Sequence, residues 1–240
     1  MIGQGAGGDR TVEIDRLAEV TALAVLERTA RDRRFSLLTE EAGKLDFGAE
    51  QPLVVMDPID GSLNAKQGVP CFAVMLSLAE GPLLGDLVAG YTLNLVNGET
   101  WTAIRGGGAS HRGEPLIPLP RRERWRLEIV GLESSPRSVF SAEPLLKKAG
   151  KLRILGSVAI SLAHAAAGSF DIFCSPMRSR VFDLTAGALL IREVGGVLTD
   201  MAGSALEHVP IGLDVRTTLL AAADPDAHRL ALRILGEDAR

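Results

Sequence analysis

Asp57-Pro58-Ile59-Asp60-Gly61-Ser62 is the stretch on which the fold and the chemistry of this chain depend. It follows Leu53-Val54-Val55-Met56, a short apolar run that is typical of a buried strand. Pro58 has no backbone N–H and restricts the residue before it to extended geometry, so the strand is expected to end here. Asp57 and Asp60 would then stand at the carboxyl end of the strand, on either side of a tight turn.

Two carboxylates this close in the chain repel each other unless a cation lies between them. A hard divalent ion such as Mg²⁺ prefers carboxylate, carbonyl and water oxygens, and Gly61 lets an anion approach the main chain closely. An Asp-Gly pair alone is more often an ordinary surface turn. However, a second acidic pair, Glu40-Glu41, follows the apolar run 35–38. Acidic residues that directly follow two predicted strands favour a shared metal site over a simple turn.

The composition is that of a soluble globular protein. The 240 residues suffice for one large domain or two packed halves, and the net charge of -4 argues against a general nucleic-acid binder. Cys71 and Cys174 lie in apolar segments and indicate buried thiols. The amino-terminal stretch lacks the basic flank and apolar core of a signal peptide, and no apolar run is long enough to span a bilayer. We therefore expect a cytoplasmic protein with neither a membrane nor a nucleic-acid partner.

The pattern of apolar residues predicts two halves of different architecture. In the first, a helix over 11–31 carries Ile14, Leu17 and Val25 on its apolar face. Strands follow it as an antiparallel meander, with Asn97-Gly98 as a hairpin turn. In the second half, strands and helices alternate.

The proline-rich segment 115–124 is the predicted joint between the halves. Its basic pair Arg121-Arg122 is expected to be solvated, since no interleaved aromatics or glycines accompany it. We divide the chain into 1–118, which carries Glu40 and the Asp57–Ser62 motif, and 119–240, which carries Asp183. Together they are expected to form one catalytic unit.

Two later motifs extend the pattern. Gly156-Ser157 leads into an Ala-rich helix, and Phe182-Asp183-Leu184-Thr185-Ala186-Gly187 opens another, in which Asp183 stands at the expected N-cap. Taken in order with Thr39-Glu40-Glu41 and the stretch 57–64, these motifs resemble the inositol monophosphatase family. The marks of that family are a Glu-Glu pair, an Asp-Pro-Ile/Leu-Asp-Gly-Thr/Ser motif and a late aromatic-Asp-x-x-Ala-Gly motif.

The resemblance covers nearly the whole chain from Asp9 onward. Asn64-Ala65 and Gly168-Ser169-Phe170-Asp171 are most similar to the archaeal-type enzymes that also act on fructose 1,6-bisphosphate. The resemblance implies an α/β (α+β) fold, a five-layered α-β-α-β-α sandwich that is usually a homodimer. It also implies Mg²⁺-dependent hydrolysis of a small phosphorylated sugar or polyol, with two or more ions per active site.

The resemblance assigns roles by position. It implies that one metal is held by Glu40, Asp57 and the Ile59 carbonyl, and a second by Asp57, Asp60 and Asp183. Backbone N–H groups of Gly61 and Ser62 would bind the phosphate at a helix start. The attacking water would be positioned by Glu40, the Ser62 hydroxyl and Asp15. The substrate-binding set is completed by Gly156, Ser157, Arg178 and Arg180.

The two arginines carry a separate hypothesis, that they help to hold the distal phosphate of fructose 1,6-bisphosphate. Surface arginines at a helix entrance are an equally good interpretation of Arg178 and Arg180. Two metal ions can activate a nucleophile on one side of phosphorus and stabilise the leaving oxygen on the other. The lack of a Ser/His/Asp triad is therefore no objection to hydrolysis.

Two alternatives stay open. One is a phosphatase of the same fold that acts on 3′-phosphoadenosine 5′-phosphate. The other is a non-catalytic descendant that binds a partner. The intact set of Glu40, Asp57, Asp60 and Asp183 argues against the second alternative, because clustered carboxylates without a metal are costly to keep.

Overall fold

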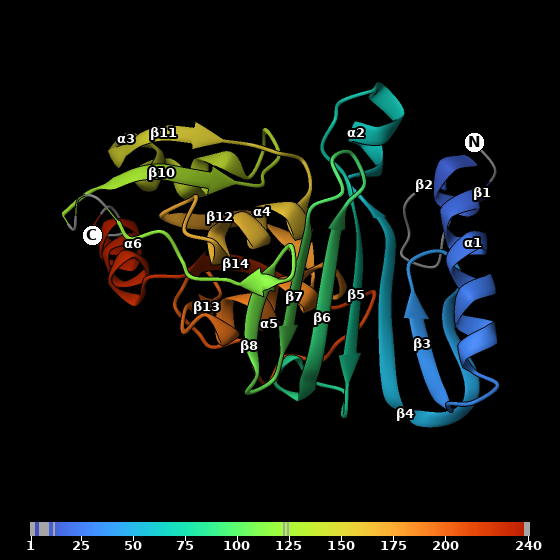
Figure 1. Cartoon of the computed structure of the whole chain (residues 1–240). Helices are drawn as coiled ribbons and strands as arrows, with labels where there is room; N and C mark the ends of the chain where they lie inside the picture. Colours follow the sequence, from blue (N-terminus) through green and yellow to red (C-terminus); the bar gives the residue numbers. More distant parts are fainter. Residues whose placement is uncertain (1–2, 5–9, 12, 122, 124, 238–240) are drawn as a thin grey trace.

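Five layers follow one another across the molecule in Figure 1. The computed structural model describes residues 3–4, 10–11, 13–121, 123 and 125–237. Its layers are helix α1, a seven-stranded sheet, helices α4 and α5, a five-stranded sheet, and helices α3 and α6. The predicted α-β-α-β-α sandwich is therefore confirmed. No helix in these ranges is both long and apolar enough to cross a membrane.

The first sheet has the strand order β3-β4-β5-β6-β7-β8-β9. Its strands are β3 (Phe35–Thr39), β4 (Gly43–Asp60), β5 (Ala73–Ala79), β6 (Leu87–Asn94), β7 (Thr100–Ile104), β8 (Gly108–His111) and β9 (Glu114–Pro115). From β4 onward each strand runs antiparallel to the next, which confirms the predicted meander. The short elements between strands are α2 (Ser62–Gln67) and the 3-10 turn η1 (Leu84–Asp86).

Strand β3 lies between two segments of β4, an arrangement that the sequence analysis did not predict (Figure 1). Residues 43–47 fold back antiparallel to β3, and Thr39 faces Gly43. Residues 53–56 run parallel to β3, and Thr39 faces Met56. Because Thr39 and Met56 are partners on parallel segments, the residues that follow them lie at the same end of β3. These residues are Glu40 and Asp57.

Helix α1 (Glu13–Thr29) covers the outer face of this sheet, but with a different side from the one predicted. Three of its apolar side chains pack on the sheet core: Ala22, Leu23 and Leu26. The three apolar residues expected to face inward are exposed instead: Ile14 is 39% exposed, Leu17 59% and Val25 49%. Asp15 and Glu19 are buried instead. Apolar residues occur on several sides of this helix, so periodicity alone did not identify the inner one.

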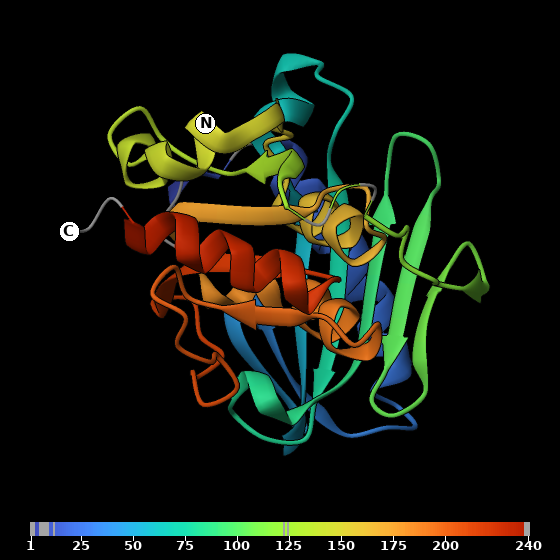
Figure 2. The ribbon, with the colours of Figure 1, turned by 90° about the vertical axis from the view of Figure 1, so that its left-hand side faces the viewer.

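The second sheet has the order β11-β10-β12-β14-β13. Its strands are β10 (Leu127–Leu132), β11 (Ala149–Arg153), β12 (Ile172–Arg180), β13 (Val197–Thr199) and β14 (Arg216–Ala222). The helices of this half are α3 (Glu143–Lys148), α4 (Val158–Ala166), α5 (Thr185–Glu193) and α6 (Pro225–Glu237), with 3-10 turns η2 (Val139–Ala142) and η3 (Val181–Leu184). Figure 2 shows α6 lying along this sheet. A further pair, β1 (Gly3–Gln4) and β2 (Arg10–Thr11), is antiparallel.

The main hydrophobic core draws on both halves of the chain. Val55 and Trp101 of the first sheet share it with Leu162 of α4, Leu189 of α5 and Leu219 of β14. Helices α4 and α5 are therefore buried between the sheets, and each sheet covers one side of them. The division between residues 118 and 119 stays a prediction.

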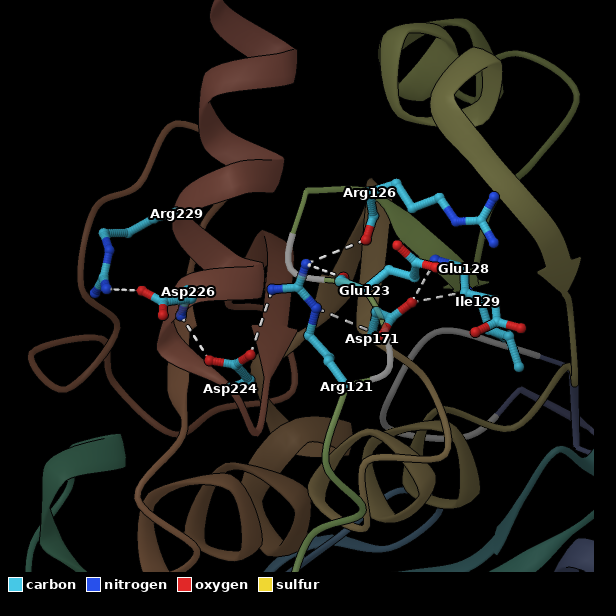
Figure 3. A network of polar contacts seen from close by, with 9 residues as sticks. All are labelled: Arg121, Glu123, Arg126, Glu128, Ile129, Asp171, Asp224, Asp226 and Arg229. Carbon is cyan, nitrogen blue, oxygen red and sulfur yellow. Dashed lines mark hydrogen bonds and ion pairs between the residues drawn. The ribbon is translucent and has the colours of Figure 1, made fainter.

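Arg121, in the segment that joins the two sheets, is buried rather than solvated as expected. Its side chain is 5% exposed and forms ion pairs with Asp224 at 3.3 Å and Asp171 at 3.7 Å (Figure 3). It also donates hydrogen bonds to the carbonyl oxygens of Glu123 and Arg126. The joint is thereby fixed to the second sheet. The other member of the basic pair, at position 122, lies outside the described residues.

Candidate active site

Glu40 begins the tight turn that joins β3 to β4. This turn is held from behind by Glu19 of α1, whose buried carboxylate accepts hydrogen bonds from the Thr39 hydroxyl at 2.6 Å and from the Ala42 N–H at 3.1 Å. The Glu40 side chain itself is 15% exposed. A buried acid on the outer helix thus fixes the turn that presents Glu40.

Asp57 and Asp60 stand at the end of β4, as the motif predicted. The pairing with β5 jumps from Asp57 opposite Met75 to Asp60 opposite Ala73, so the backbone bulges at the residues between them. The Ile59 N–H donates to Asp57 Oδ1 at 2.9 Å. Both carboxylates are buried, at 1% and 8% exposure.

Gly61 ends this strand in a conformation that only glycine adopts easily, with φ +88°. A Cβ at this position would lie 3.0 Å from the carbonyl oxygens of Cys71 and Gly156. Helix α2 begins at the next residue, the half-buried Ser62. The predicted phosphate-binding turn is therefore packed directly against the predicted substrate-binding residues Gly156 and Ser157.

Ser157 and the first turn of α4 bind Asp60. The Ser157 hydroxyl donates to Asp60 Oδ2, and the N–H groups of Val158 and Ala159 donate to the same carboxylate at 3.2 and 2.9 Å. Ser157 is also the N-cap of α4, because its Oγ accepts from the Ile160 N–H at 3.2 Å. The carboxylate of Asp60 thus lies at the positive end of this helix.

Asp183 lies in η3 and does not cap α5, contrary to the expectation from sequence. Its Oδ2 accepts from Nε of Arg180 at 3.0 Å, and Nη1 of the same guanidinium contacts Glu40 Oε1 at 2.5 Å. Arg180 therefore joins an acid from each half of the chain. Its predicted contact with a distal phosphate is untested, and the structure engages it with two carboxylates instead.

Arg178 takes a different course from Arg180. It is exposed, and its guanidinium donates to the carbonyl oxygen of Arg216 at 2.8 Å. Asp15, the other outlying member of the predicted set, is buried on the inner side of α1. The structure thus brings Glu40, Asp57, Asp60, Asp183 and Arg180 together, and it places Arg178 outside their hydrogen-bond network.

Burial and repulsion between carboxylates raise the pKa values of the three aspartates of the site. Burial, and then the charges of Glu40, Asp60 and Asp183, raise the pKa of Asp57 well above its usual range. Burial also raises the pKa of Asp60, although Ser157 and the α4 amides oppose it. Burial raises the pKa of Asp183 to about 7, against the opposing charge of Arg180. Four acids within electrostatic reach of one another favour binding of a cation.

The donor set fits a hard divalent ion by its chemistry. Carboxylate oxygens are the ligands that Mg²⁺ prefers, and Asp183 Oδ1 is buried with no hydrogen-bond donor among the described residues. Within the same part of the chain, no three His, Cys, Asp or Glu side chains are arranged as a formed metal site. Instead, Arg180 pairs with oxygens of the predicted ligands Glu40 and Asp183. Backbone N–H groups of α4 bind the oxygens of a third predicted ligand, Asp60.

Sequence reasoning missed two residues that support the site. Glu19 was not among the predicted site residues, although it anchors the Glu40 turn. The Asn64 amide donates to the carbonyl oxygens of Cys71 and Leu155, at 2.8 and 2.7 Å, and thereby joins α2 to the segment before Ser157. An acid aligned with Asp15 one helical turn later was the available signal for Glu19.

Comparison with known proteins agrees with the fold. The model of the inositol monophosphatase family matches residues 3–238. A fructose-1,6-bisphosphatase/inositol-1-monophosphatase from Methanothermobacter thermautotrophicus is 30% identical over 98% of this chain and 86% of that protein. A bifunctional NADP phosphatase/NAD kinase from Methanococcus maripaludis is 27% identical, over 89% of this chain and 40% of that protein.

Solved structures show the same architecture. The crystal structure of an inositol monophosphatase–fructose 1,6-bisphosphatase superimposes on this chain with a TM-score of 0.83, at 24% identity. The match covers 97% of this chain and 88% of that one. The five layers and the match of the family model over nearly all residues lead to one conclusion: this chain belongs to the inositol monophosphatase family and is a phosphoric monoester hydrolase.

Proposed function

We propose that this enzyme removes phosphate from inositol 1-phosphate, fructose 1,6-bisphosphate or both, and that it requires Mg²⁺. The observation that carries the proposal is the environment of Asp57. This carboxylate is 1% exposed and lies within electrostatic reach of Glu40, Asp60 and Asp183. A buried acid among three others is expensive without a bound cation, which supports a cation site at this position.

The residues that would hold two ions are Glu40, Asp57, the Ile59 carbonyl, Asp60 and Asp183. Asp57 would be shared between the ions. When bound, such ions lower the pKa of a water and neutralise charge on a departing oxygen. Asp60 can bind an ion while it also accepts hydrogen bonds from α4. Ser157, Val158 and Ala159 supply three donors, and a carboxylate has further acceptor positions.

The remaining residues of the chain would orient the substrate and the water. Backbone N–H groups of Gly61 and Ser62 are proposed to bind the phosphate, since Gly61 has no side chain to block it. Glu40 would accept a hydrogen bond from the attacking water. The Ser62 hydroxyl would also hydrogen-bond this water, and Asp15 would support both residues. Gly156 and Ser157 would bind the substrate from the opposite side of Gly61, against which they pack.

Phosphate release is the test. The wild-type chain and Asp57→Asn would be assayed with inositol 1-phosphate, fructose 1,6-bisphosphate, 3′-phosphoadenosine 5′-phosphate and NADP, each with and without Mg²⁺. Thermal unfolding with and without Mg²⁺ would accompany every assay. We expect Mg²⁺-dependent turnover of the first two substrates, and in Asp57→Asn the loss of both turnover and the Mg²⁺-dependent rise in melting temperature.

The other outcomes separate the alternatives. Turnover of 3′-phosphoadenosine 5′-phosphate or NADP alone would contradict the proposed substrates but would still support the proposed metal site. Mg²⁺ binding without turnover of any of these four substrates would point to another phosphomonoester as the substrate. No effect of Mg²⁺ on stability or turnover would contradict the site assignment itself and would favour the non-catalytic, partner-binding descendant. The homodimer, the cytoplasmic location and the lack of nucleic-acid and membrane partners stay predictions.

A further inference from the structure

Arg180 connects acidic residues that come from opposite halves of the chain. It is the last residue of β12, and its side chain is 11% exposed. Nη1 contacts Glu40 Oε1 in the turn after β3, and Nε contacts Asp183 Oδ2 in η3. A guanidinium is planar and presents its donors in fixed directions. The two carboxylates are therefore held at a fixed separation and orientation.

The pairing engages only one oxygen of Asp183. The other oxygen, Oδ1, is buried, and no hydrogen-bond donor reaches it within the described part of the chain. An acceptor that is buried and unsatisfied is costly, and an ion ligand at this oxygen would remove that cost. The contact with Arg180 is thus compatible with ion binding through the second oxygen.

We infer that Arg180 is a positioning residue for the divalent-cation site, acting through Glu40 and Asp183 rather than on the substrate. The inference rests on the proposed function, in which these two acids belong to different ions. Arg180 would align both ligands before either ion binds. Partners of this kind, which hydrogen-bond the ligands of a metal, typically change metal affinity by about 10- to 100-fold when they are replaced.

Arg180→Lys is the most informative variant. Lysine keeps the positive charge but is a point charge without the planar fork, so it cannot hold both carboxylates in the same way. Arg216→Lys is the matched control, because Arg216 lies opposite Arg180 on β14, is exposed, and has no ion pair among the described residues. Binding of Mg²⁺ and Mn²⁺ to the full chain would be measured by calorimetry without substrate.

We expect Arg180→Lys to weaken Mg²⁺ binding at least about tenfold and Arg216→Lys to leave it unchanged. At saturating Mg²⁺, KM should be the same as in the wild type for inositol 1-phosphate and for fructose 1,6-bisphosphate. Unchanged or tighter metal binding would overturn the inference. A rise in KM for the bisphosphate alone would overturn it too, in favour of a phosphate contact.

Two controls keep the result interpretable. If Arg180→Lys does not fold, as judged by circular dichroism, Arg180→Gln carries the same titration, since its amide can still donate to one carboxylate. If the wild-type chain binds no Mg²⁺, the proposed function fails. If the wild type binds Mg²⁺ and the variants bind it equally well, only the role of Arg180 fails.

Discussion

Ser157 donates its hydroxyl to Asp60, and so joins the first turn of α4 to the end of β4, 97 residues earlier in the chain. The same hydroxyl oxygen caps α4 by accepting from the Ile160 N–H. One side chain therefore serves two purposes: it begins a helix of the central layer and fixes a carboxylate of the candidate active site.

Ser157→Ala should lower the free energy of unfolding by about 1–2 kcal/mol, which is the usual cost of losing an N-cap. It should also raise the pKa of Asp60 further, because a hydrogen bond to the charged form is lost. Urea unfolding of Ser157→Ala and of Ser157→Thr would measure the first effect. Thr retains a hydroxyl, so a loss of equal size in both variants would contradict the assignment.

Gly61→Ala should be more damaging than Gly68→Ala. Both glycines have positive φ, at 88° and 72°, so both substitutions carry a conformational cost of about 1 kcal/mol. Only at Gly61 would the new Cβ meet backbone oxygens at 3.0 Å, whereas nothing lies within 4 Å at Gly68. We expect Gly61→Ala to unfold at lower urea and to lose phosphatase activity. Equal stability of the two variants would show that the contact of the new Cβ with the backbone oxygens does not destabilise the fold.

The stability of the metal-free protein should fall as the pH rises from about 5 to about 7. Asp183 has a pKa of about 7 in the folded state, against 3.8 as the ordinary value. Between these values the native state holds a proton that the unfolded state has lost, so the free energy of unfolding decreases with pH, by up to about 1.4 kcal/mol per unit. Thermal unfolding in EDTA would show the decline.

Asp183→Asn provides the comparison, since asparagine does not titrate in this pH range and so removes the contribution of the Asp183 carboxyl to the pH dependence. Its stability should decline less steeply with pH than that of the wild type. Saturating Mg²⁺ should also flatten the wild-type curve, because the cation stabilises the charged carboxylate. An equally steep or steeper decline in Asp183→Asn would mean that other groups determine the pH dependence.

Arg121→Met should lower the free energy of unfolding by about 3 kcal/mol, because it leaves the largely buried Asp171 without its cation. Arg105→Met is the control: Arg105 pairs with Glu80, and these side chains are 46% and 63% exposed. An exposed pair contributes at most about 1 kcal/mol. Urea unfolding of both variants tests the difference, and similar losses would argue against a structural role for the buried pair.

The strands of the fold and the grouping of Glu40, Asp57 and Asp60 could be predicted from short-range sequence patterns, whereas the five layers were expected only from the resemblance to a family. Apolar runs mark the strands, and acids that follow two such runs meet at one sheet edge when the strands are parallel neighbours. The position of Asp183 beside them could not come from spacing, since it depends on how the second sheet packs on the first. That information came from the resemblance to a family.

The contacts of individual side chains were much less predictable. Glu19 and Arg121 carry charges, and charged side chains are mostly exposed, so their residue type favours solvent exposure. Each is buried because its partner is supplied by a distant segment: the turn after β3 for Glu19, and Asp171 and Asp224 for Arg121. Arg180 illustrates the same limit, because its distance from Glu40 is set by the packing of the two sheets.

The course of β4 around β3 has a practical consequence for labelling the protein. The bend over residues 48–52 lies at the opposite end of β3 from Glu40 and Asp57, and Gly48, Glu50 and Gln51 are exposed there. A few residues inserted at this bend would add little loop-closure entropy and would leave Thr39 opposite Met56. A fluorescent tag could therefore be attached here without moving either acid, whereas the same insertion in the turn 40–42 would displace Glu40.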